Sequence, residues 1–305
     1  MTVAGDPDDL DAAARVFAEV RPRLFGIAYR MLGSAAEAED LVQDVWLRWQ
    51  AYDRATVEHP PAFLATTITR LAINAAQSAR ARRETYPGPW LPEPVDTGAD
   101  PYLGAERGEA LGFAVLLLLE RLSPTERAAY VLREAFEYSY REIAAIVQLN
   151  EPAVRQLVSR ARKRLLGERR KPVTGAEQRR LLTAFVAAAR AGDLRALEEL
   201  FAADVTSYSD GGGAVRASRF PVVGRERVAK YVRAFAGHFW AGVEVAWASV
   251  NGQPAALLSR DGEVFTVLTV EASREGIEQV LWMMNPAKLT AVPAGGPGNG
   301  SAPRA

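Results

Sequence analysis

The stretch "SYREIAAIVQLNEPAVRQLVSRARKRL", Ser139 to Leu165, decides the fold of the middle of the chain. Its apolar residues recur at helical spacing on both sides of a tight join at Leu149–Asn150, which predicts two packed helices. Asn150 can cap the second helix, and Pro152 fits the first turn of that helix. Two short helices joined in this way predict a helix-turn-helix.

The second helix of this pair carries a basic outer face. Arginine can pair with guanine edges in the major groove and glutamine with adenine edges, whereas basic residues farther along contact phosphates. The alternative is an ordinary helical hairpin with a solvated basic face. The candidate DNA-contacting residues are Arg155, Gln156, Ser159, Arg160, Arg162, Lys163 and Arg164.

Composition sets the wider limits. A chain of 305 residues predicts two or three domains. The absence of cysteine excludes disulfides and thiolate metal sites and suits the cytosol. The longest apolar run, Phe113 to Leu119, is too short to span a bilayer, and the first residues lack a signal pattern. The sequence therefore predicts a cytoplasmic protein without membrane contact, cofactor or metal.

The sequence before residue 84 also has helical periodicity. Ser34 and Glu37 form a predicted capping box at the start of one helix. That helix has an exposed acidic face, suited to a basic partner surface, with Asp40, Gln43, Asp44 and, at its edge, Trp46. The alternative is a solvated helix face without a partner.

A later helix in the same region ends in a basic cluster. Arg70 and Asn74 are four residues apart and share one helical face. Arg80, Arg82 and Arg83 follow at the end of the helix, where basic side chains suit phosphate contacts.

The two helical regions together resemble an extracytoplasmic-function (ECF) sigma factor, a promoter-recognition subunit of bacterial RNA polymerase. "AEDLVQDVWLRWQ" resembles the region-2 helix that grips the polymerase β′ clamp, and "FLATTITRLAINAAQSARARR" resembles the region-2 helix that meets the −10 element. The segment from Arg121 to Leu165 resembles region 4, which reads the −35 element. The resemblance implies core polymerase, through its β′ clamp and β flap, and promoter DNA as partners.

A third domain follows Pro172. Two predicted helices precede segments of strand-like alternation with glycine-containing turns, which predicts an α+β fold. This region resembles the cone-shaped SnoaL-like domains of the NTF2-like group. The expected chain therefore has an all-α region-2 domain (8–83), a linker (84–105), an all-α region-4 domain with the helix-turn-helix (106–171), a SnoaL-like domain (174–290) and a disordered tail (291–305).

Three short motifs resemble those of a sigma-factor group that carries such a third domain. They are "WLPEP" in the linker, "DGGG" and "NPAKL", in which Ala287 replaces the usual acidic residue. Their residues are the candidate interdomain regulatory site: Trp90, Leu91, Pro92, Glu93, Pro94, Asp210, Gly211, Gly212, Gly213, Asn285, Pro286, Lys288 and Leu289.

The linker motif places large apolar side chains among prolines. Prolines prevent the regular structure that would bury Trp90 and Leu91 locally, and an exposed pair forgoes about 1.5–3 kcal/mol per side chain. We expect "WLPEP" to dock near Asp210–Gly213, where bare glycine backbone admits a bulky ring, with Asn285–Leu289 adjoining. The third domain would then regulate the sigma factor in cis. Alternatively, Trp90 packs on the helices beside it.

An enzymatic alternative uses the third domain. In an isomerase or cyclase of this fold, Asp210 is a possible base and Tyr208 a possible oxyanion donor. The glycines after Asp210 favour a backbone role instead. His238, beside Phe239 and Trp240, is expected to be a packing or pocket-wall residue and not a catalyst. We therefore expect a transcription initiation factor and not an enzyme.

Overall fold

The computed structural model describes residues 7–97, 112–166 and 171–290. The predicted tail and linker residues 98–105 lie outside the described residues. The described chain forms two compact units, one containing residues 7–84 and 115–166, the other containing residues 85–97, 112–114 and 171–290. The linker that follows residue 84 thus belongs to the same unit as the C-terminal α+β domain.

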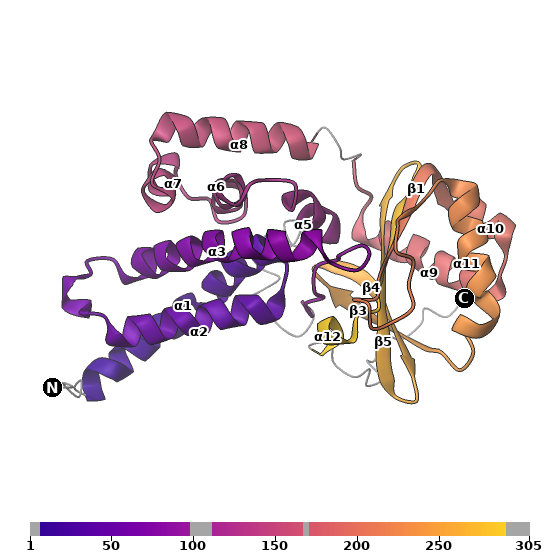
Figure 1. Cartoon of the computed structure of the whole chain (residues 1–305), viewed down its shortest axis with the longest axis horizontal. Helices are drawn as coiled ribbons and strands as arrows, with labels where there is room; N and C mark the ends of the chain where they lie inside the picture. Colours follow the sequence, from indigo (N-terminus) through magenta and orange to yellow (C-terminus); the bar gives the residue numbers. More distant parts are fainter. Residues whose placement is uncertain (1–6, 98–111, 167–170, 291–305) are drawn as a thin grey trace. The chain divides into compact units, whose positions relative to one another are not determined.

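Three long helices form the first part of the first unit (Figure 1). They are α1 (Pro7–Leu32), α2 (Ala35–Ala51) and α3 (Pro60–Glu84), with a 3₁₀ turn at Arg54–Thr56. Helix α1 packs on both α2 and α3. Ser34 caps α2 by accepting a hydrogen bond from the Glu37 amide, as the sequence predicted. The buried faces of the three helices include Ile27, Trp49 and Ile68.

Four shorter helices follow among the described residues: α5 (Phe113–Leu119), which begins in the second unit and continues into the first, and α6 (Pro124–Glu134), α7 (Tyr140–Val147) and α8 (Glu151–Leu166) of the first unit. Ser123 and Ser139 each form a full capping box at the start of α6 and α7. Helix α7 ends at Gln148 in the left-handed conformation (φ 57°), and the Asn150 side chain accepts from the Ala153 amide at 2.9 Å. The predicted helix-turn-helix, formed by α7 and α8, is confirmed.

Within this unit α6 packs on α1 and α3. The Arg127 side chain is buried, and it donates to the Met31 carbonyl at 2.5 Å and to Glu120 at 2.6 Å. A buried arginine needs such partners because an unpaired charge away from water is costly. Arg127 therefore helps to hold the helices before and after the linker in one unit.

The second unit is α+β, as predicted. Helices α9 (Gly175–Ala191) and α10 (Leu194–Leu200) precede β1 (Phe201–Asp210), β2 (Val222–Val223), α11 (Arg225–Phe239), β3 (Glu244–Val250), β4 (Gln253–Arg260), β5 (Glu263–Ser273), β6 (Gly276–Met283) and α12 (Pro286–Leu289). The strand order is β2-β1-β6-β5-β4-β3, and only the β1–β6 pair is parallel among the described strands.

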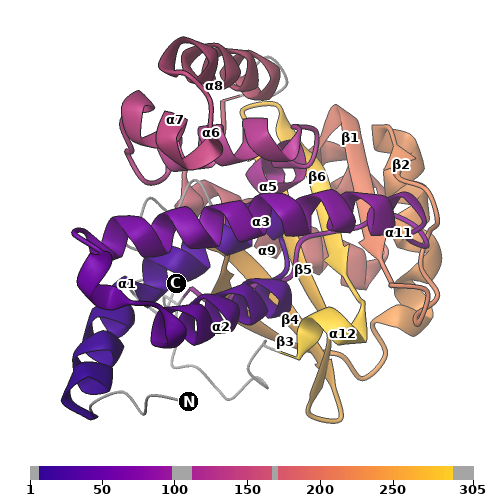
Figure 2. The same cartoon turned by 60° about the vertical axis from the view of Figure 1, so that its left-hand side comes forward.

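Helices α9, α10 and α11 lie on one face of this sheet, and α12 lies on the other (Figures 1 and 2). The core between sheet and helices contains Phe185, Phe201, Val232 and Trp282. Helix α11 was not predicted from the sequence. It matters for the site because, together with the strands, it encloses a cavity.

Candidate DNA-binding face and linker site

Along α8, buried and exposed side chains alternate with the period of the helix. Val154, Val158 and Ala161 are buried against the rest of the unit. Arg155, Gln156, Ser159, Arg160, Lys163 and Arg164 are exposed, and Arg162 is half-buried. The structure thus brings the candidate base readers together on one outward face of the second helix of the motif.

Ion pairs divide this face into two groups. Arg155 pairs with Glu151 at 2.5 Å, Arg162 with Glu134 at 2.6 Å and Arg164 with Glu126 at 3.3 Å. Gln156, Ser159, Arg160 and Lys163 make no side-chain hydrogen bond or ion pair within the described part of the chain. The second group is available to a ligand as it stands, whereas the first must exchange a partner.

The acidic face of α2 is exposed at Asp40, Gln43 and Asp44. Asp44 approaches Arg48 at 3.6 Å, a solvent-exposed pair of small energetic value. Trp46 is half-buried, and its ring centroid lies 5.0 Å from that of Phe17. Beside it, Leu47 is 54% exposed, so this face offers apolar as well as acidic contact area.

The candidate residues on α3 are engaged to different degrees. Arg70 donates to the carbonyls of Ala145 and Ile146 at the end of α7, at 3.1 and 3.0 Å. Arg82 pairs with Glu37, and Arg83 pairs with Glu120 and donates to the Leu32 carbonyl. Asn74 and Arg80 are exposed. Arg83 therefore serves the fold here, and a phosphate contact would require its ion pair to open.

A buried carboxylate organises the linker site in the second unit. Asp210, at the end of β1, is fully buried and pairs with the Lys288 ammonium at 2.8 Å. It also accepts from the Leu91 amide at 2.9 Å, the Tyr86 hydroxyl at 2.6 Å and the Gly212 amide at 3.1 Å. Lys288 in turn donates to the Leu91 carbonyl at 2.5 Å. The linker backbone is thus bound from both sides of the ion pair.

The linker aromatics surround Lys288. Its ammonium lies 4.4 Å from the Trp90 ring centroid and 5.0 Å from that of Tyr86. Asn285 caps α12 and donates to the Tyr86 hydroxyl at 2.9 Å. Burial, and next the hydrogen bond to Asp210, raise the pKa of Tyr86 well above its usual range, so its hydroxyl stays a donor. The structure brings residues of all three motifs together.

The glycines have a different role from the predicted one. At Gly212 (φ 60°) the space for a Cβ is taken by the Asn285 amide, and at Gly213 (φ 76°) Pro87 lies 3.0 Å from such an atom. We expected the bare backbone to admit the Trp90 ring. That expectation is wrong, because the ring lies over Lys288 and the glycines admit Asn285 and Pro87.

A second attachment, which the sequence analysis missed, holds the linker farther on. Asn251 is fully buried at the turn after β3. Its side-chain oxygen accepts from the Val95 amide at 2.8 Å, and its backbone N–H donates to the Val95 carbonyl at 2.9 Å. Thr97 bonds the Ser249 carbonyl through its amide at 3.2 Å. The "NG" turn at Asn251–Gly252 was visible in the sequence, but its long-range partner was not.

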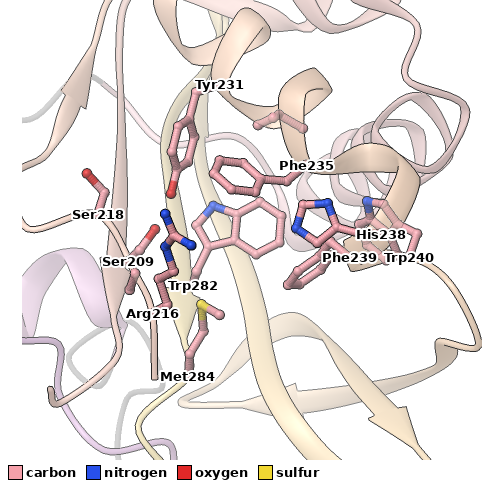
Figure 3. Close-up of a pocket in the computed structure, with 12 residues that line it drawn as sticks. Ser209, Arg216, Ser218, Tyr231, Phe235, His238, Phe239, Trp240, Trp282 and Met284 are labelled. Atoms are coloured by element: carbon pink, nitrogen blue, oxygen red, sulfur yellow. The ribbon is translucent and has the colours of Figure 1, made fainter. Parts of the chain in front are cut away.

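A cavity of about 550 Å³ lies elsewhere in the same unit, and His238 forms part of its wall, one of the two roles expected for it (Figure 3). Neither Asp210 nor Tyr208 lines it. The idea of Asp210 as a base in a pocket is therefore wrong, since its carboxylate is turned to the linker. Among the described residues no group of three or more histidines and carboxylates could hold a metal ion. No described helix could span a membrane.

The two helical regions and the basic α8 face define a class, the sigma-70-type promoter-recognition subunits. Family models agree: "Sigma-70 region 2" matches residues 16–82 and "Sigma-70, region 4" matches residues 112–165. The chain is 35% identical over 292 residues to the ECF RNA polymerase sigma factor SigJ of Mycobacterium tuberculosis (91% of this chain, 93% of that protein). It is 30% identical over 286 residues to the probable ECF sigma factor SigI of the same species (92% and 95%).

A crystal structure of Mycobacterium tuberculosis SigJ matches with a TM-score of 0.73 and 30% identity, over 92% of this chain and 99% of that one. The chain belongs to the ECF RNA polymerase sigma factors. Its partners are accordingly core RNA polymerase and promoter DNA.

Proposed function

We propose that the C-terminal domain regulates this sigma factor in cis by binding the linker between regions 2 and 4. The observation that carries the proposal is the buried Asp210–Lys288 pair, which is bonded on both sides to the backbone of Leu91. A linker held in this way has fewer conformations than a free one. The two DNA-binding regions it joins then have a restricted range of separations.

The finer assignments follow the same proposal. Region 2 comprises residues 8–83, the linker 84–105, region 4 residues 106–171 and the regulatory domain residues 174–290. Region 2 meets the β′ clamp through Asp40, Gln43, Asp44 and Trp46, and region 4 meets the β flap. The −10 element is contacted by Arg70, Asn74, Arg80, Arg82 and Arg83. The −35 element is contacted from α8 by Arg155, Gln156, Ser159, Arg160, Arg162, Lys163 and Arg164.

The engaged arginines support a regulated rather than a permanently open factor. Arg70 is bonded to the end of α7, the first helix of the helix-turn-helix. A −10 contact by this side chain requires α3 to release α7. We infer that region 2 and region 4 separate when the promoter is bound, and that the linker controls how far.

Promoter spacing tests the regulatory proposal. Run-off transcription with core polymerase is measured on templates whose −35 to −10 spacer is changed one base pair at a time. The wild-type chain should show a single narrow optimum. Leu91→Pro removes the amide donor to Asp210 and should broaden the optimum, whereas Leu91→Ala keeps the donor and serves as the matched control. An unchanged profile in Leu91→Pro, with linker amides shown by hydrogen exchange to be released, would contradict the proposal.

Charge reversal tests the clamp assignment. Asp40→Arg combined with Asp44→Arg should strongly weaken capture by core polymerase, because like charges at an interface cost several kcal/mol. Asp11→Arg combined with Glu19→Arg changes the same charge on exposed positions of α1 and should not. Equal capture of the two double variants, both folded by circular dichroism, would remove the assignment.

A further inference from the structure

The cavity between α11 and the sheet has the size and lining of a small-molecule site. Its volume of about 550 Å³ is in the range of ligand pockets. Much of its wall is apolar and aromatic, with side chains from α11 and from β6 facing one another (Figure 3). The lining residues that supply apolar surface include Val232, Phe235, Phe239, Trp240, Trp282 and Met284.

A few polar groups converge in this apolar cavity. Ser209, only 5% exposed, lines the cavity from β1, and Tyr231 and the exposed Arg216 line it as well (Figure 3). These three side chains make no hydrogen bond or ion pair within the described residues. Polar groups that line an apolar cavity without a protein partner are available to hydrogen-bond a ligand.

The charge of the lining residues indicates which charge a ligand of this cavity should carry. Arg216 is charged, and none of the described residues that line the cavity is a carboxylate. A guanidinium binds a carboxylate with two parallel, charge-assisted hydrogen bonds, and hydroxyl groups can donate to the same oxygens. We propose that this cavity binds a small organic carboxylate with a flat aromatic or polycyclic body. Arg216, Ser209 and Tyr231 hold the carboxylate, and the aromatic wall holds the body.

The same elements connect the cavity to the linker site. Successive residues of a strand point to opposite faces of a sheet. Ser209 accordingly lines the cavity, while its neighbour Asp210 holds the linker. Likewise Met284 lines the cavity and donates its amide to the Asp210 carbonyl at 2.8 Å, while the next residue, Asn285, bonds Tyr86.

The loop after Asp210 supplies a second connection. Arg216 and Ser218 line the cavity. The Ser218 carbonyl and the Arg219 Cα each lie 3.7 Å from the position of a Cβ on linker residue Gly88. A carboxylate that fixes Arg216 thus also fixes the loop on which Gly88 rests. The ligand strengthens linker binding, and this part of the inference rests on the proposed regulatory function.

Binding is tested on the full chain with 2-naphthoate and its uncharged analogue 2-naphthalenemethanol, by isothermal titration calorimetry. The wild-type protein should bind the carboxylate at least tenfold more tightly than the alcohol. Arg216→Gln should abolish this preference and leave the alcohol unaffected. Arg219→Gln removes an equal charge from the same loop but outside the cavity, so it should keep the preference. No carboxylate binding, or an equal loss in both variants, would overturn the site.

Linkage is tested by hydrogen exchange at the Leu91 amide, which reports directly on its bond to Asp210. Saturating 2-naphthoate should slow this exchange at least threefold in the wild-type chain and leave it unchanged in Arg216→Gln. Binding without slower exchange would overturn the linkage. The promoter-spacing experiment contains no ligand, so its outcome is independent of both results.

Discussion

Two groups of charged residues in this molecule, on α8 and around Asp210, are built in opposite ways. On α8 the cations are exposed except for the half-buried Arg162, and Arg155, Arg162 and Arg164 are paired with carboxylates. Around Asp210 the ion pair is almost completely buried, with exposed side-chain fractions of 0% for Asp210 and 8% for Lys288. Surface pairs cost little to exchange, whereas a buried pair is costly to break. The exposed pairs on α8 suit a surface whose arginines exchange carboxylate partners for DNA phosphates or bases. The buried pair at Asp210 suits a contact that stays closed in the absence of a specific signal.

The largest effect is expected from breaking the buried Asp210–Lys288 ion pair. Asp210→Ala leaves the Lys288 ammonium buried without its counter-charge and should lower the free energy of unfolding of the second unit by about 3–5 kcal/mol. Urea unfolding followed by tryptophan fluorescence measures this. Asp210→Ala combined with Lys288→Met should recover most of the loss, and Glu244→Ala, an exposed carboxylate control in the same unit, should change stability little. A double variant no more stable than Asp210→Ala would show that the lost charge pair is not the cause.

The next largest effect tests whether Gly212 is needed to make room for the Asn285 side chain. Gly212 and Gly242 both have positive φ, 60° and 67°, but a Cβ meets the Asn285 amide only at Gly212 and open space at Gly242. Gly242→Ala should cost about 1–2 kcal/mol for the left-handed backbone, and Gly212→Ala about 1–3 kcal/mol more for the displaced side chain. Chemical denaturation of both variants compares them. Equal costs would mean that Asn285 moves away freely and does not fix the linker site.

On the exposed side, substitutions should change recognition and not folding. Arg160→Ala should cost about 1–3 kcal/mol at one promoter base pair, because an arginine that reads a base loses that contact alone. Arg164→Ala should weaken binding evenly across base changes and lower the salt slope by about 1. A promoter-variant binding series at several salt concentrations separates the two. If both substitutions respond alike to every base change, α8 does not read bases through Arg160.

The smallest effect concerns the cap of α7. Hydrogen bonds from the Ser139 side chain and backbone, opposed by partial burial, lower the pKa of Glu142. This stabilisation is present above the ordinary glutamate pKa and is lost as the pH falls through the lowered pKa. Ser139→Ala should cost about 1 kcal/mol and return the pKa of Glu142 toward its ordinary value. An NMR titration of Glu142 checks the direction, and an unchanged pKa would contradict it.

Local signals explain what the sequence could predict. Ser123, Ser139 and Asn150 satisfy nearby amides, so the caps and the helix-turn-helix were readable within a few residues. Helix α11 was missed although its buried residues Val228 and Val232 are four apart, because the glycines and aromatics around it resemble strand and turn sequence.

The linker site was predictable only in part. The motifs pointed to Asp210 and Lys288, but the hydroxyl of Tyr86 and the side chain of Asn251 were not anticipated. Their partners lie 124 and 156 residues away along the chain, and no periodicity carries information over that distance. The residue that fills the space beside Gly212 was likewise undecidable, because a glycine shows that room is needed and not for which side chain.

Because Lys288 lies near the end of the described chain, the linker site can close only late in the synthesis of the protein. The linker and region 4 leave the ribosome before any of the strands that hold Asp210, and the ammonium that completes the ion pair comes about 120 residues after α8 ends. At roughly 5–20 residues per second, this leaves an interval of about 6–24 s in which region 2 and region 4 exist without a closed linker site. If the linker site regulates the factor as proposed, a newly made chain passes through a form without this control before the site closes.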